Sequence, residues 1–148
     1  MEITKEVLFI IKMVVVIAIL GLESVKDIRT RNISLKPILI GMLFGVFLMI
    51  PEGINGFLAA LTGMLPGIPL IVFSFLTKEK IGYGDGFILI FAGFLLGIKC
   101  AVFILLSGML CCALVSVILL ILKKGDRNTT LPFVPFLILP CILYCFVK

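Results

Sequence analysis

The sequence predicts an all-α fold, a polytopic membrane helix bundle of about six transmembrane helices. The first supporting observation is composition, because 62% of the 148 residues are hydrophobic and the mean hydropathy is +1.36. The second is charge, since only 14% of the residues are charged, whereas a soluble domain carries roughly 25%. A chain of this length corresponds to one domain, so we expect residues 1–148 to form a single integral-membrane domain.

Long apolar segments are the candidate membrane spans, because a spanning helix needs about 20 apolar residues. In chain order they cover residues 7–22, 37–50, 54–76, 86–98, 100–122 and 131–147. Acidic Glu2 and Glu6 precede the first segment and no small-residue cleavage site follows it, so we expect a retained helix rather than a signal peptide. Segments 37–50 and 86–98 are short, and a re-entrant 86–98 would leave one spanning helix fewer.

Glycines and prolines indicate how these helices pack. G-x-x-x-G spacing, which permits close helix approach, occurs at Gly41/Gly45, Gly63/Gly67 and Gly93/Gly97. Prolines should kink segment 54–76, at Pro66 and Pro69, and make the last helix irregular, at Pro132, Pro135 and Pro140.

The distribution of Lys and Arg predicts the orientation in the membrane. Basic residues concentrate in the first, third and fifth loops, at Lys26, Arg29, Arg31, Lys36, Lys78, Lys80, Lys123, Lys124 and Arg127. The opposite face carries only Lys5, Lys99 and Lys148, and we expect Lys12 to extend out of the first helix toward water. Since cytosolic loops carry the excess of positive charge, these three loops should be cytosolic and both termini outside.

Composition also excludes several kinds of ligand. The net charge of +5 comes without a basic stripe of interleaved aromatic residues, so we expect the lipid bilayer and no nucleic acid as a partner. The chain has no His and its five Cys form no C-x-x-C, so we expect neither a metal site nor a cofactor. We interpret the cysteines as small packing residues.

The residues that carry chemistry are two acids at the ends of apolar segments. Gly82-Tyr83-Gly84-Asp85 places a carboxylate next to two glycines at the start of segment 86–98, and Asp27 follows the first segment. An ionisable residue at a membrane helix is costly and indicates a functional site, while Gly82 and Gly84 allow close backbone approach. A carboxylate pair that shares one proton can hydrolyse a peptide bond.

Each acid also has a simpler interpretation. Asp27 lies one helical turn before Arg31, so the two can form an ion pair in a solvated loop. Asp85 can act as the N-cap of a helix that starts at Gly86, a role that is compatible with catalysis.

Three segments together resemble the type IV prepilin peptidase family of G-x-G-D aspartyl proteases. The first is residues 82–85 with the apolar run to Gly97, the second is Asp27-Ile28-Arg29-Thr30-Arg31-Asn32-Ile33, and the third is Leu131-Pro132-Phe133-Val134-Pro135-Phe136-Leu137. The resemblance covers essentially the whole chain. It implies that Asp27 and Asp85 are the catalytic pair, and that the protein lacks the cysteine-rich methylating domain of longer members.

The resemblance further implies a substrate and a location. Family members cleave the basic leader of prepilins and pseudopilins, in type IV pilus and protein secretion systems, at the cytosolic face of the cytoplasmic membrane. That face agrees with the orientation predicted from Lys and Arg, which places Asp27 and Asp85 on the cytosolic side.

The chain departs from the family pattern at three positions. Phe87 replaces the usual Lys after the second acid, Ile33-Ser34-Leu35 replaces Ile-Pro-Asn, and Val134 replaces a Gly between prolines. With Phe87, the motif around the second acid resembles that of the presenilin and signal-peptide-peptidase branch. That branch has a Tyr-Asp pair in its other catalytic helix, and this pair is absent here. The alternatives to prepilin cleavage are therefore a protease of that branch, a membrane carrier that uses the two acids, or a non-catalytic assembly subunit.

Overall fold

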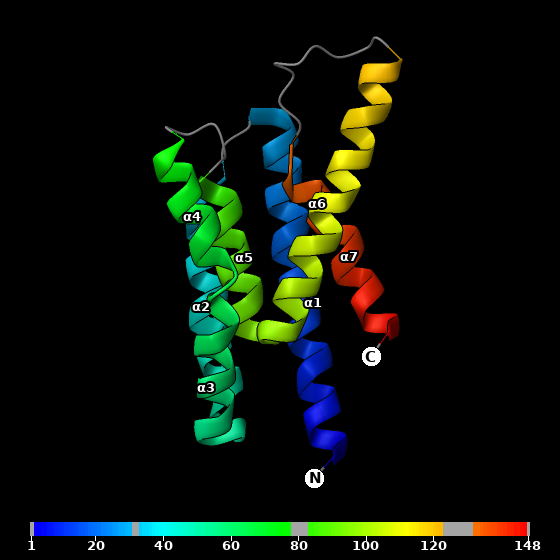
Figure 1. The fold of residues 1–148 in the computed structure, drawn as a ribbon. Coiled ribbons are helices and arrows are strands. Elements are labelled where there is room, and N and C mark those ends of the chain that lie inside the picture. The colour runs from blue at the N-terminus through cyan, green and yellow to red at the C-terminus, as the bar shows by residue number, and fades with distance from the viewer. Residues whose placement is uncertain (1, 31–32, 78–82, 123–131, 148) are drawn as a thin grey trace.

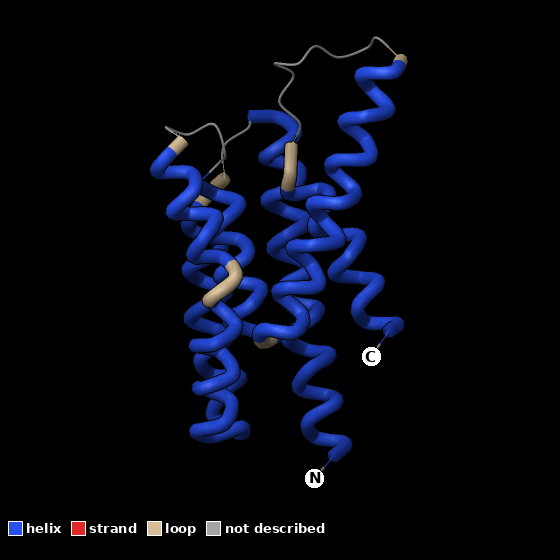
Figure 2. Tube along the Cα trace, viewed as in Figure 1, coloured by secondary structure: helices blue, strands red, loops and turns tan. Residues whose placement is uncertain are grey.

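The structure is a computed structural model that describes residues 2–30, 33–77, 83–122 and 132–147, and the described chain is a bundle of helices without strands (Figures 1 and 2). The helices are α1 (Glu2–Thr30), α2 (Leu35–Met49), the 3-10 helix η1 (Ile50–Glu52), α3 (Gly53–Met64), α4 (Gly67–Leu76), α5 (Tyr83–Leu96), α6 (Ile98–Ile121) and α7 (Val134–Val147). The predicted all-α class is confirmed.

Three described stretches are long and apolar enough to cross a membrane, namely Thr4–Thr30, Leu35–Leu76 and Ile98–Ile121. Two shorter apolar helices, Tyr83–Leu96 and Val134–Phe146, complete the bundle. Large apolar side chains cover its outer surface, as lipid contact requires. The chain is thus a membrane helix bundle, while the number of about six crossings stays a prediction.

The chain runs back and forth along the bundle axis (Figure 1). The apolar stretch Leu35–Leu76 doubles back at η1, where Gly53 has a φ of 61°, a left-handed conformation that suits glycine. The C-terminal ends of α1, α4 and α6 lie toward one end of the bundle, and both chain termini lie toward the other (Figure 1). The three connections rich in Lys and Arg therefore start from one common end.

Proline separates α3 from α4, as the sequence predicts. Pro69 has no N–H to donate to the carbonyl of Leu65, and Ile68 N donates to that carbonyl instead, at 3.3 Å. The last helix, α7, begins at Val134, after Pro132 and Phe133, and continues to Val147 with Pro140 inside it. The predicted irregularity of this helix stays a prediction.

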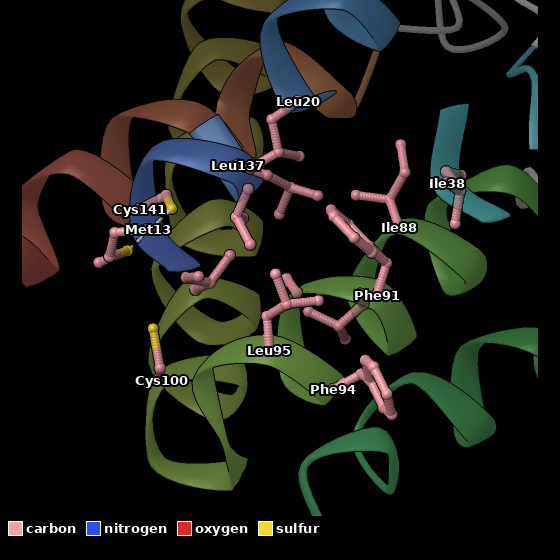
Figure 3. Packing of buried hydrophobic residues seen from close by; sticks show 14 of the residues in the cluster. Met13, Leu20, Ile38, Ile88, Phe91, Phe94, Leu95, Cys100, Leu137 and Cys141 are labelled. Carbon is pink, nitrogen blue, oxygen red and sulfur yellow. Dashed lines mark hydrogen bonds between the residues drawn. The ribbon is translucent and has the colours of Figure 1, made fainter. Parts of the chain in front are cut away.

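Helix α5 is the centre of the bundle. It contacts α1, α2, α3, α4 and α6, and its side chains are buried almost throughout. In Figure 3, Ile88, Phe91 and Leu95 of α5 point into the same core as Leu20 of α1 and Leu137 of α7. A helix enclosed in this way positions any residue at its start against several neighbours at once.

Glycines let α3, α4 and α5 approach closely. A Cβ added at Gly93 of α5 would lie 1.8 Å from the carbonyl oxygen of Gly63 in α3, and one added at Gly67 of α4 would lie 2.9 Å from the carbonyl oxygen of Gly86 in α5. The predicted close packing at Gly63 and Gly67 is therefore present. Gly97 plays a different part, because its φ of 82° forms the turn between α5 and α6.

The prediction that Lys12 extends out of the first helix toward water is wrong. Instead of extending into water, it is 6% exposed in its side chain, and its Nζ lies 2.7 Å from Oε2 of Glu52 in η1. The reason is that the turn between α2 and α3 brings Glu52, 40 residues away in sequence, next to Lys12. Burying the two charges as an ion pair costs less than burying either charge without a partner.

The five cysteines, all within the described ranges, form no disulfide, and their exposure varies. Cys100 and Cys141 are buried, as expected for packing residues, whereas Cys145 is exposed. Within the described ranges, no group of three or more His, Cys, Asp or Glu side chains is arranged to hold a metal ion.

Candidate active site

Asp27 lies inside α1, near its C-terminal end, and is 7% exposed. Its Oδ2 accepts a hydrogen bond of 3.3 Å from the backbone N–H of Val134, the first residue of α7. A helix N-terminus offers unpaired N–H groups and a positive dipole end, which suit a carboxylate. The interpretation of Asp27 as a solvated loop residue is therefore wrong, and its suggested partner Arg31 lies outside the described residues.

Asp85 is the third residue of α5 and is half-buried. The helix begins at Tyr83 rather than at Gly86, so Asp85 lies in the first turn instead of at the N-cap position. An acid in the first turn still interacts favourably with the helix dipole. The N-cap prediction for Asp85 is therefore wrong, because Tyr83 and Gly84, which were expected to precede the helix, belong to it.

The fold brings the two acids together. Although they are 58 residues apart in sequence, the Asp85 carboxyl lies within electrostatic reach of Asp27. Contact between α1 and α5 along the core produces this arrangement. Asp27 lies near the C-terminal end of α1 and Asp85 lies in the first turn of α5. The C-terminal end of α1 lies toward the end of the bundle from which the basic connections start (Figure 1).

Gly84, which precedes Asp85, is in close contact with the segment between α1 and α2. A Cβ added at Gly84 would lie 2.4 Å from Cδ1 and 2.5 Å from Cβ of Ile33. Of the two reasons for a glycine here, positive φ and close approach, the structure shows the second. Gly82, the other glycine of the motif, lies outside the described residues.

Two further polar groups each lie near one of the two acids, and sequence reasoning assigned neither of them a role. Glu23, one turn before Asp27, is fully buried, and its Oε2 accepts a hydrogen bond of 2.7 Å from the backbone N–H of Ser34. Cys112 of α6 lies within electrostatic reach of Asp85. The four-residue spacing of Glu23 and Asp27 was a sequence signal for a shared helix face, whereas nothing in the sequence indicated Cys112.

Comparison with known proteins adds one finding. The sequence model of the type IV leader peptidase family matches residues 14–117, a range that contains Asp27, Asp85 and the whole of the 82–85 motif. A comparison with curated proteins and one with solved structures found no match.

Proposed function

Because the chain belongs to the type IV leader peptidase family, we propose that this membrane peptidase is an intramembrane aspartyl endopeptidase with Asp27 and Asp85 as its catalytic pair. Its substrates are prepilin- or pseudopilin-like proteins of a type IV pilus or secretion system. It removes their basic leader peptide at the cytosolic face of the cytoplasmic membrane.

The single observation that carries this proposal is that Asp27 and Asp85, which belong to two different helices, lie within electrostatic reach of each other. Like charges held close together do not both ionise, so such a pair shares one proton. The ionised carboxylate accepts a proton from water as the water oxygen attacks the scissile carbonyl carbon. The protonated carboxyl donates its proton to the carbonyl oxygen, and the tetrahedral intermediate then collapses with proton transfer to the leaving amine.

The positions of the acids favour a peptidase over a carrier. A carrier needs acids along a path through the membrane, in the middle of helices. Asp27 lies three residues from the end of α1 and Asp85 lies in the first turn of α5. Acids at one end of the bundle suit a substrate that is cut where a polar leader meets a hydrophobic helix.

Asparagine variants test the catalytic assignment. Asp27→Asn and Asp85→Asn should each abolish cleavage of a co-expressed prepilin, measured by its mobility shift, because either change leaves no pair that shares a proton. Membrane insertion should be unchanged. The matched control is Glu6→Gln, an isosteric change at an exposed acid of the same chain. Wild-type cleavage by either aspartate variant refutes the assignment.

Cysteine labelling tests the proposed orientation separately. In a Cys-free variant, a cysteine at Thr129 should react with a membrane-impermeant maleimide only from the cytosolic side, and one at Asn55 only from outside. The reverse pattern would place the acids on the wrong face for a prepilin leader, and the substrate class would then be abandoned before the peptidase.

A further inference from the structure

Glu23 is a buried acid that the proposed reaction does not use. It is fully buried in α1, one helical turn before Asp27. Its Oε2 accepts the hydrogen bond from Ser34 N, while its Oε1 is buried and has no hydrogen-bond partner among the described residues. Burial of a carboxyl with one oxygen unpaired is costly, and a hydrophobic residue at this position would avoid that cost.

The hydrogen bond from Ser34 links two parts of the site. Ile33, the residue before Ser34, is in close contact with Gly84, where an added Cβ would meet three Ile33 side-chain atoms within 2.8 Å. Gly84 directly precedes Asp85. The sequence of contacts therefore runs from Glu23 on the Asp27 helix, through Ser34 and Ile33, to the start of the Asp85 helix.

We propose that Glu23 is a positioning residue of the active site, and this inference rests on the proposed function. By holding the backbone of Ser34, Glu23 keeps Ile33 against Gly84 and so fixes the distance between the two catalytic acids. Glu23 takes no part in proton transfer. Its role is to keep the start of α5 against α1, because a displacement of about 1 Å at a catalytic group costs about 10²-fold in rate.

A second contact to Ser34 supplies a comparison. Lys26 Nζ donates a hydrogen bond to Ser34 Oγ, and this contact is exposed. An exposed polar contact contributes little because water competes for both groups. The buried bond to Glu23 should therefore carry the positioning effect, and the exposed bond from Lys26 should not.

Kinetics on a purified, reconstituted enzyme with a prepilin-derived substrate test the proposal. Glu23→Ala should lower kcat by about 10- to 100-fold with KM changed less than about threefold. Glu23→Gln keeps an acceptor oxygen for Ser34 N and should retain most of the activity. Lys26→Ala is the matched control and should retain wild-type kcat.

Ser34→Pro removes the donor N–H at a residue whose φ is −88°, and it places the family's usual Pro of Ile-Pro-Asn at this position. It should reproduce the kcat of Glu23→Ala, and the double variant should be no slower than either single one, since both remove the same bond. Ser34→Ala, which keeps the N–H, should lose less activity than Ser34→Pro. If Glu23→Ala does not fold, Ile33→Ala tests the same contact at Gly84 and should also lower kcat.

The outcomes separate this inference from the proposed function. Wild-type kcat in Glu23→Ala, or multiplied losses in the double variant, overturns the positioning role. Loss of all activity in Glu23→Gln with an intact fold also overturns it, because that result requires an acid in the chemistry itself. Asp27→Asn and Asp85→Asn, assayed in parallel, report on the proposed function: their activity would refute the catalytic pair whatever the Glu23 variants do.

Discussion

Gly93→Ala should disrupt the contact between α3 and α5 and lower both stability and activity. A Cβ at Gly93 would lie 1.8 Å from the carbonyl oxygen of Gly63 and 2.6 Å from its carbonyl carbon. Ordinary contact between such atoms lies at about 3.5 Å, so the two helices must separate by about 1.7 Å. Overpacking of this kind costs about 1–3 kcal/mol, and about 2 kcal/mol lowers the melting temperature of a chain this long by about 4–8 °C.

Activity should fall further than stability, because α5 also carries Asp85 at its start. The matched control is Gly21→Ala in α1, where an added Cβ meets nothing within 4 Å. That change should leave cleavage intact and raise stability slightly, since Ala is a better helix former than Gly. Thermal unfolding in detergent and prepilin cleavage measure the two effects. If Gly93→Ala melts and cleaves like Gly21→Ala, the close helix contact has no energetic role and the reasoning fails.

Gly84→Val should reduce cleavage severely by displacing Ile33, and Ile33→Ala in the same chain should restore part of that loss; wild-type cleavage by Gly84→Val would show that the contact is dispensable. Lys12→Met should lower the melting temperature by leaving Glu52 without its ion-pair partner, and the double variant Lys12→Met/Glu52→Gln should melt closer to wild type. Equal melting of the single and double variants contradicts an energetic role for the pair.

The fold class was readable from the sequence because hydropathy and loop charge report directly on a lipid environment. Helix boundaries were less readable where polar residues are buried. The first segment was predicted to end at residue 22, yet α1 continues to Thr30. The apolar run ends before Glu23, so hydropathy alone places the end of the helix there. In the structure Glu23 and Asp27 are buried inside the helix. Glu23 accepts a hydrogen bond from the backbone N–H of Ser34, and Asp27 accepts one from the backbone N–H of Val134.

The same limit applies to the candidate site. Sequence pattern identified Asp27 and Asp85 as chemically unusual, but only the packing of α1 against α5 places them near each other. The ion pair of Lys12 with Glu52 forms because the turn after α2 brings Glu52 next to α1. The local spacing of residues in the sequence does not indicate which distant residue such a turn brings close. Sequence reasoning therefore expected the two acids to pair, but it missed the other contacts between distant segments, such as those of Glu23 with Ser34 and of Asp27 with Val134.

Stability and catalysis should be closely linked in this protein, because the parts of the site come from three helices. Asp27 belongs to α1, the N–H that binds it belongs to α7, and Asp85 belongs to α5. Each of these helices packs on the core formed by Phe91 and Leu137, both fully buried. A change in that core alters the relative positions of the three helices before it unfolds any of them, since packed cores transmit displacements rather than absorbing them. Core variants should consequently lose kcat at temperatures where the bundle is still folded.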